Sequence, residues 1–146
     1  MYSPLQMAAD LPENYEAHMD AFQFIKDVAV DWDDTKVLDA EPGDYIVIAR
    51  KAKGKDNWFM GAITDENGRG FSQGLEFLDA GKKYVATIYR DGDKADWKNN
   101  PEEYVVEKFI VDNKTKLRLK LAPGGGSAVS LMPATAGETK QLKKYK

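Results

Sequence analysis

The feature that most constrains the fold is a series of short apolar runs between residues 44 and 131. The runs are rich in β-branched and aromatic side chains, and Gly, Asp, Asn and Pro lie between them. The pattern is clearest at residues 117–121, where three leucines alternate with Arg118 and Lys120, as in a strand with one buried face. Short strands at regular intervals with turn residues between them predict a mainly β fold, an antiparallel β-sandwich of about eight strands.

We expect strands at residues 35–39, 45–51, 58–64, 71–77, 82–90, 104–111, 117–121 and 127–132. The runs at 45–51 and 58–64 are apolar on both faces at their centres, which predicts central positions in a sheet. Residues 123–126 read Pro-Gly-Gly-Gly, and we interpret them as a turn before an edge strand. Glu107 lies within a strand, and we expect it to form an exposed cross-strand ion pair.

The first 30 residues have the pattern of a different fold. Residues 1–10 are mostly apolar and predict a buried strand followed by a loop. Asp10 is a suitable helix N-cap, and Glu13 follows three residues later as in a capping box. The helix is expected to continue to about Val28. One stripe of this amphipathic helix carries the residues spaced by three and four: Leu11, Tyr15, His18, Phe22 and Ile25.

A strand followed by an amphipathic helix is a β-α unit, which belongs to parallel-sheet proteins covered by helices. One such unit cannot close a barrel, so we interpret residues 1–30 as the end of a truncated (β/α)₈ barrel. Residues 31–133 are then the β-sandwich, and Trp32 with its acidic neighbours joins the two parts. Residues 134–146 are expected to form a basic flexible tail, solvated and frayed, because they contain four lysines and one glutamate.

Composition excludes several classes of function. The chain has no Cys and a net charge of −3, so it can form no disulfide or thiolate metal site, and we expect no nucleic-acid partner. No apolar run approaches the roughly 18 residues of a membrane span. The first residues lack the charged and apolar regions of a signal peptide. Either the protein is cytosolic, or the chain is an internal piece of a secreted protein.

No group of residues predicts a catalytic or metal site. Asp91, Asp93 and Asp96 are close enough in sequence to bind Ca²⁺, but they do not follow the EF-hand order, and solvated loop acids are the alternative. A glycosidase needs two carboxylates facing one cleft, and no spacing singles out such a pair. His18 lies on the apolar helix stripe, which favours a hydrogen-bonded packing role. One His and no Cys exclude zinc and Cys–His catalysis.

Two aromatic residues are candidates for carbohydrate binding, because ring faces suit the C–H faces of sugars. Trp97 is the stronger candidate, since it lies in a polar loop, and Tyr104 follows that loop. The alternative is that Trp97 folds back onto the sandwich or contacts a domain outside this chain.

Several motifs, taken together and in this order, resemble the C-terminal region of glycoside hydrolase family 97. They are FIKDV at 24–28, DWDDT at 31–35, LDAEPGDYI at 38–46, WFMGAITDE at 58–66, ATIYRDG at 86–92, NPEEY at 100–104 and LAPGGG at 121–126. Residues 1–22 look like the close of that family's barrel.

The resemblance implies a parent α-glucosidase or α-galactosidase, of a kind found chiefly in Bacteroidetes, that is periplasmic or secreted. Such a parent has an N-terminal β-sandwich, a catalytic barrel that uses Glu or Asp with a calcium ion, and a C-terminal β-sandwich. The family's catalytic and calcium-binding residues lie upstream and match no position here, so no cofactor is expected in this fragment. Because barrel active sites lie at the C-terminal ends of strands, the loop at Asp10 is expected near the parent's active-site face.

Three functions follow from these observations. The first is a non-catalytic C-terminal accessory domain, structural or oligomerising, whose partners are the remaining barrel and the N-terminal domain of the parent. The second is a carbohydrate-binding module that binds an oligosaccharide, and the third, which no group of residues supports, is an independent small enzyme. We expect the apolar helix stripe to pack on the sandwich or to form a homodimer with a second copy.

Overall fold

The computed structural model describes residues 9–146, so the strand expected at the very start of the chain lies outside the described residues. The described part contains α1 (Pro12–Glu16), α2 (Met19–Asp27), β1 (Trp32–Glu41), β2 (Tyr45–Ala52), β3 (Trp58–Thr64), β4 (Arg69–Gly74), β5 (Tyr84–Asp91), β6 (Tyr104–Val111), β7 (Lys116–Leu121), β8 (Gly126–Pro133) and α3 (Ala136–Gln141).

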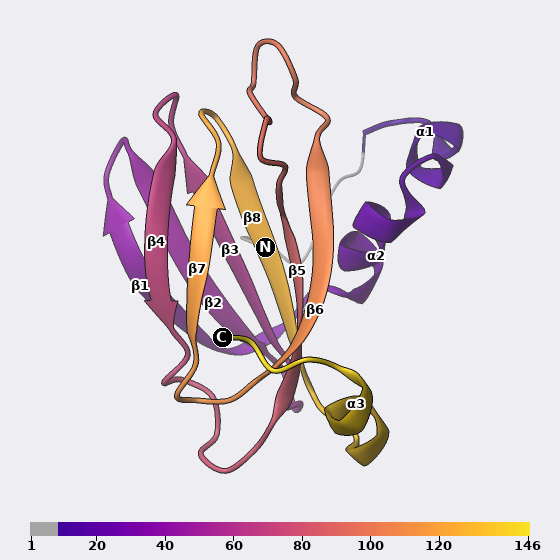
Figure 1. Cartoon of the computed structure of the whole chain (residues 1–146), viewed down its shortest axis with the longest axis vertical. Coiled ribbons are helices and arrows are strands. Elements are labelled where there is room, and N and C mark those ends of the chain that lie inside the picture. Colours follow the sequence, from indigo (N-terminus) through magenta and orange to yellow (C-terminus); the bar gives the residue numbers. More distant parts are fainter. Residues whose placement is uncertain (1–8) are drawn as a thin grey trace.

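The strands form two antiparallel sheets. The larger sheet has six strands in the order β1-β2-β3-β8-β5-β6, and β4 pairs with β7 in a separate two-stranded sheet. Figure 1 shows β4 and β7 in front of the larger sheet, while α1 and α2 lie beside and behind β6. The antiparallel sandwich expected from the sequence is confirmed, and β2 and β3 are central strands as predicted.

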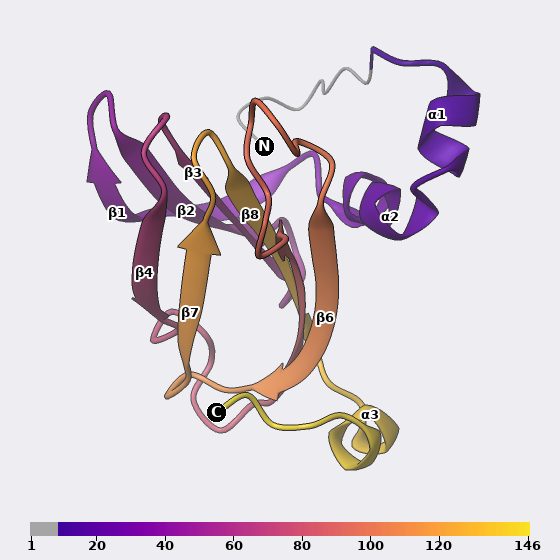
Figure 2. The same ribbon diagram turned by 45° about the horizontal axis from the view of Figure 1, so that its top comes forward.

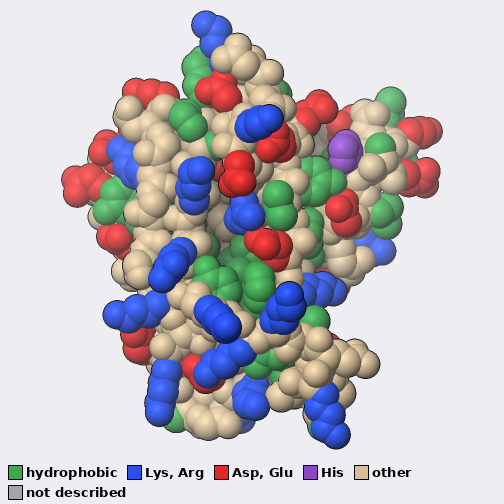
Figure 3. All heavy atoms as spheres, viewed as in Figure 1, with side chains coloured by type: hydrophobic (Ala, Val, Ile, Leu, Met, Phe, Trp, Pro, Cys, Tyr) green, Lys and Arg blue, Asp and Glu red, His purple; other side chains and the backbone are tan. Residues whose placement is uncertain are grey.

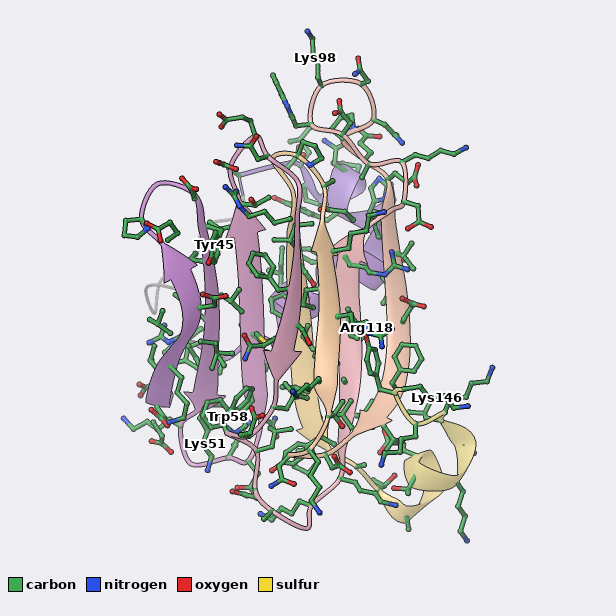
Figure 4. All side chains as sticks on the ribbon, turned by 60° about the vertical axis from the view of Figure 1, so that its left-hand side comes forward. Tyr45, Lys51, Trp58, Lys98, Arg118 and Lys146 are labelled. Atoms are coloured by element: carbon green, nitrogen blue, oxygen red, sulfur yellow. The ribbon has the colours of Figure 1, made fainter. Side chains whose placement is uncertain are left out.

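The hydrophobic core fills the space between the two sheets. Leu117, Leu119 and Leu121 of β7 are buried against the larger sheet, whereas Arg118 and Lys120 between them are exposed. Burial of apolar side chains on one face of each sheet is what holds two such layers together. Figure 4 shows Tyr45 and Trp58 at opposite ends of this space; their rings contact Phe71 and Phe77, with centroids 4.8 and 4.7 Å apart.

The prediction that the last strand lies at a sheet edge is wrong. β8 pairs with β3 on one side and with β5 on the other, so that Ala128 stands opposite both Gly61 and Tyr89. The prediction relied on the glycine-rich turn before the strand. The composition of the strand is the better guide, because Val129 and Leu131 are fully buried and the residue between them, Ser130, is small and buried as well.

The expected single N-terminal helix is divided into α1 and α2. The chain leaves helical geometry at His18, whose φ and ψ are −131° and 45°. The predicted capping box at Asp10 is also wrong, because Leu11 is the N-cap and makes no side-chain cap. The Asp10 carboxylate instead accepts hydrogen bonds from the Leu11 amide (2.7 Å) and the Asn14 side chain (2.6 Å). The break divides the apolar stripe between two short helices.

The C-terminal segment is folded, contrary to the expectation of a frayed tail. Thr135 and Glu138 form a capping box at the start of α3, which satisfies amides that have no partner within the helix. Beyond α3, Ile110 donates to the Lys143 carbonyl (2.9 Å), and Tyr145 donates to the Ile110 carbonyl (3.0 Å). The prediction was based on the lysine charges alone. The ring of Tyr145 packs against the core and so holds this segment in place.

Candidate functional site

The outer face of the larger sheet carries a layer of aromatic rings that holds α2. Phe59 points away from the core because its neighbours Trp58 and Met60 point into it, yet it is only 1% exposed. Phe24 of α2 covers it, with ring centroids 6.0 Å apart, and also contacts Tyr89 at 5.5 Å. Burial in this layer raises the pKa of the Tyr89 hydroxyl.

Trp32 extends the same layer at the start of β1. Its ring lies edge-on to Phe59, with centroids 5.9 Å apart, and the Arg50 guanidinium lies 4.5 Å from the Trp32 ring centroid. A cation over an indole face is a favourable contact. Trp32 therefore packs on the sandwich at the junction where the helices end.

A polar cluster fixes the other side of the helices. The Tyr104 hydroxyl donates a hydrogen bond to the Asp20 carboxylate at 2.8 Å. Nδ1 of His18 lies 3.2 Å from the hydroxyl oxygen of Tyr104. Because the single hydroxyl proton of Tyr104 is used in the hydrogen bond to Asp20, His18 is the donor in the hydrogen bond between His18 and Tyr104. The bond to Asp20 raises the pKa of Tyr104 and lowers that of Asp20. His18 is hydrogen-bonded as expected, but it is exposed.

The helices leave several apolar side chains uncovered. No residue of α1 or α2 is fully buried, and Leu11 and Ile25 are 66% and 50% exposed. We refer to the four exposed apolar residues of this segment as the helical apolar patch: Leu11, Met19, Ile25 and Val30. The helices do pack on the sandwich, but they do so through Phe24, which is not on the predicted stripe, while Leu11 and Ile25 of that stripe face outward. Clustered exposed apolar surface is typical of interaction sites.

Trp97 lies in the loop between β5 and β6 and is 59% exposed. It borders a hollow of about 560 Å³ that Ile63, Pro123 and Gly124 also line. Gly124 has a φ of +69°, and a Cβ there would lie 3.0 Å from the Trp97 Cβ, so this close approach requires glycine. Figure 4 shows the neighbouring Lys98 at the tip of the loop.

The acidic residues of this loop bind backbone amides. Asp91 accepts hydrogen bonds from Ala122 (2.8 Å) and Gly126 (3.0 Å), and Asp96 accepts them from the amides of two residues that follow it. No three His, Cys, Asp or Glu side chains within residues 9–146 are arranged to hold a metal ion. Two of the three carboxylates considered for calcium, Asp91 and Asp96, thus have structural partners in the turns. Asp93 is exposed and contacts Arg90 at 3.8 Å.

The structure does not bring the two candidate sugar-binding aromatics into one site. Trp97 borders the loop hollow, whereas Tyr104 borders a hollow of about 410 Å³ under α2. Asp10 lies at the exposed start of α1, where the hydrogen bond from Asn14 lowers its pKa. The predicted roles of these three residues remain predictions.

The predicted cross-strand ion pair of Glu107 is confirmed, with Arg90 as its partner at 3.0 Å, but the pair is part-buried and not exposed as expected. An ionic cluster that sequence reasoning missed joins Arg69 to Asp44 at 3.0 Å and to Asp65. Its only sequence signal is the i, i+4 spacing of Asp65 and Arg69, which lie between the strands expected at residues 58–64 and 71–77. In the part of the chain that the structure describes, no helix is long and apolar enough to cross a membrane.

Comparison with known proteins connects this geometry to enzymes of glycoside metabolism. The chain is 39% identical over 129 residues to a retaining alpha-galactosidase of Bacteroides thetaiotaomicron, covering 88% of this chain and 19% of that protein. A glycoside hydrolase family 97 enzyme from a Pseudoalteromonas species, solved in complex with acarbose, superposes with a TM-score of 0.90 at 48% identity. That match covers 92% of this chain and 21% of the solved chain.

A more distant relative has the same fold. A beta-arabinopyranosidase superposes with a TM-score of 0.68 at 28% identity, over 87% of this chain and 19% of that structure. The chain thus spans about a fifth of the length of each of these relatives. A family model described as glycosyl-hydrolase 97 C-terminal, oligomerisation, matches residues 31–132. The resemblance seen in the motifs is confirmed, and the chain belongs to this family of C-terminal oligomerisation domains of glycoside hydrolase family 97.

Proposed function

We propose that this chain is the non-catalytic oligomerisation region of a larger glycoside hydrolase that acts on α-galactosides or α-glucosides. The observation that carries the proposal is the match of its whole sandwich, residues 31–132, to the C-terminal oligomerisation family. The names of the relatives, a retaining alpha-galactosidase and an enzyme bound to acarbose, support the substrate class. A calcium ion in the parent's barrel and a periplasmic or secreted parent belong to the same proposal.

The helical apolar patch is the surface we propose for oligomerisation. Met19 and Ile25 sit on α2, which Phe24 holds to the sheet, and Leu11 and Val30 flank the two helices. Burying such side chains against a second copy would remove apolar area from water at about 25 cal/mol per Å². Ile25, half exposed beside the hollow under α2, is the best position to test.

The test replaces Ile25 by Asp and follows self-association by sedimentation velocity. Ile25→Asp should weaken self-association by at least about tenfold, because a carboxylate would be desolvated in the contact. Val37→Asp is the matched control, since Val37 is also an exposed apolar residue, 61% against 50% for Ile25, on the edge strand β1. Equal behaviour of the two variants would show that the patch is not the contact.

Catalysis by the chain alone is tested with p-nitrophenyl α-galactoside and p-nitrophenyl α-glucoside. We expect no release of nitrophenol above the uncatalysed rate. Turnover that survives repurification and is proportional to the concentration of the chain would contradict the non-catalytic assignment.

A second candidate function, carbohydrate binding, is supported by the exposed ring of Trp97 beside its hollow. The other two tryptophans are buried or half-buried, so a bound sugar should perturb the fluorescence of Trp97 first. Titration with maltotriose and with an α-galactoside oligosaccharide tests this, with Trp97→Ala as control. An unchanged spectrum at millimolar sugar would remove the candidate.

A further inference from the structure

A groove opens where the two sheets part, between β6 and β7. These strands do not pair with each other, and the C-terminal segment crosses the lower end of the space between them (Figure 2), where it is hydrogen-bonded to Ile110 of β6. The groove has a volume of about 810 Å³, which lies within the range of small-molecule sites. Figure 3 shows a hollow with a green apolar floor and blue side chains around it on this face.

The groove is strongly basic in a chain that is acidic overall. It is lined by six cationic residues and by only two carboxylates, Asp93 and Glu107, whereas the whole chain has a net charge of −3. The six cations come from two strands and the C-terminal segment: Arg90, Arg118, Lys120, Lys143, Lys144 and Lys146. A concave surface lined by one sign of charge attracts ligands of the opposite sign.

Four of these cations have no carboxylate partner within residues 9–146. Arg90 pairs with Glu107 at 3.0 Å, and Lys144 pairs with Asp112 at 3.4 Å. No ion pair within the described residues involves the remaining four, which border the groove from β7 and from the C-terminal segment: Arg118, Lys120, Lys143 and Lys146. Figure 4 labels Arg118 and Lys146. The groove therefore holds more positive charge than its own carboxylates neutralise.

The floor of the groove is aromatic and fixed in place. Tyr145 and Phe109 meet edge to face with centroids 5.2 Å apart. The Tyr145 hydroxyl accepts a hydrogen bond from the Arg118 amide at 3.0 Å, and its own amide is bonded to Ile110. A floor already held in this way loses little freedom when a ligand binds.

We propose that this groove binds an oligosaccharide that carries carboxylate or sulfate groups. The unpaired Arg and Lys side chains supply charge-assisted hydrogen bonds to such groups, and the half-buried rings of Tyr145 and Phe109 supply apolar contact for the sugar body. An inorganic anion would leave that floor unused. This binding goes beyond the proposed oligomerisation and does not depend on it.

Isothermal titration calorimetry at low salt tests the proposal on the 146-residue chain. The probes are trigalacturonate for carboxylates and a sulfated heparin disaccharide for sulfates, with maltotriose and inorganic sulfate as comparisons. We expect at least one acidic saccharide to bind with a Kd below about 1 mM, and the neutral and inorganic probes to bind at least about tenfold more weakly.

The matched variants are Arg118→Ala/Lys120→Ala in the groove and Lys114→Ala/Lys116→Ala outside it. All four residues are exposed, on β7 or in the turn before it, and each double variant removes two positive charges. The groove variant should weaken binding by at least about tenfold, and the control by less than about twofold. Circular dichroism confirms that both variants are folded.

Three results would overturn the proposal. Equal weakening by both double variants would indicate general attraction between charges. Inorganic sulfate that binds as tightly as the saccharides would indicate an anion site without a sugar. No binding of either acidic saccharide, together with loss of self-association in Arg118→Ala/Lys120→Ala, would assign the groove to an acidic surface of a second copy.

Discussion

Arg69 joins two turns of the sandwich that are distant in sequence. Its guanidinium contacts Asp65 in the loop before β4 and Asp44 in the turn before β2, the latter at 3.0 Å, and it also lies 5.3 Å from the centroid of the Tyr45 ring. The hydrogen bond from Arg69 is the largest of the interactions that hold the pKa of Asp65 at about 2, below its ordinary 3.8.

This depressed pKa predicts a dependence of stability on pH. A carboxylate with a lowered folded-state pKa contributes stability above its unfolded pKa and loses it as the pH falls through the folded one. The free energy of unfolding should therefore fall between about pH 4 and pH 2 in part through Asp65. Asp65→Asn should make this decrease shallower in urea unfolding curves.

Glu66→Gln is the control for this prediction. Glu66 is the exposed neighbour of Asp65 and makes no ion pair within the described residues 9–146. Glu66→Gln should leave the fall in the free energy of unfolding between about pH 4 and pH 2 unchanged. The same change in this pH dependence in both variants would mean that the contact between Asp65 and Arg69 does not control the loss of stability at acid pH.

Among the elements, the two short helices depend on very few contacts with the sheet. Phe24 contacts both Phe59 and Tyr89, whereas the ring that Phe22 stacks on within residues 9–146 is Tyr15 of α1, with centroids 4.6 Å apart. Helices of five and nine residues are too short to be stable alone in water. Their order therefore comes from these ring contacts and from the hydrogen bonds of His18 and Asp20 to Tyr104.

Phe24→Ala should detach α2 from the sheet. We expect the opening free energy of the α2 amides to fall by about 2 kcal/mol, below the range for a fully buried Phe because Phe24 is half-buried. Hydrogen exchange of residues 19–27 measures it. Phe22→Ala, at a similar level of burial, should cost about 1 kcal/mol or less. Equal losses would contradict the role given to Phe24.

α3 offers a second prediction at this scale. Thr135→Ala removes the capping box and should lower the stability of α3 by about 1 kcal/mol. Faster exchange of the amides of residues 136–141 is the measurement. Thr139→Ala removes only a hydroxyl that donates to the Thr135 carbonyl at 2.9 Å, and it should have little effect because Ala is the better helix former.

The elements also show what the sequence could and could not predict. The bounds of β3 and β6 agree with the prediction, because dense β-branched and aromatic runs end there at turn residues. The break at His18 could not be predicted from spacing, because its hydrogen bond is to Tyr104, 86 positions away. The place of the C-terminal segment likewise depends on pairing with Ile110.

For the candidate site, the sequence identified candidate residues but did not predict which groups surround them in the folded chain. Trp97 was correctly expected in a polar loop, and it is exposed there. Tyr104 lies instead at the helices, because the chain after the loop turns it toward Asp20. The basic groove was not predicted, since its cations come from β5, β7 and the C-terminal segment and meet only in the folded protein.

At the scale of the whole molecule, two surfaces differ in kind. The helical apolar patch lies outside the larger sheet, and the basic groove lies at the seam between the sheets. An apolar contact gains little from low salt, whereas attraction in the groove weakens as salt screens it. Self-association through the patch should therefore persist at about 0.5 M salt, while binding of acidic saccharides should be lost there.

Sedimentation equilibrium of the 146-residue chain, over roughly 1 to 100 µM, tests the central claim of an oligomerisation domain most directly. We expect an average mass that rises with concentration toward at least twice the 16.3 kDa of one chain. A mass of 16.3 kDa at every concentration would contradict it.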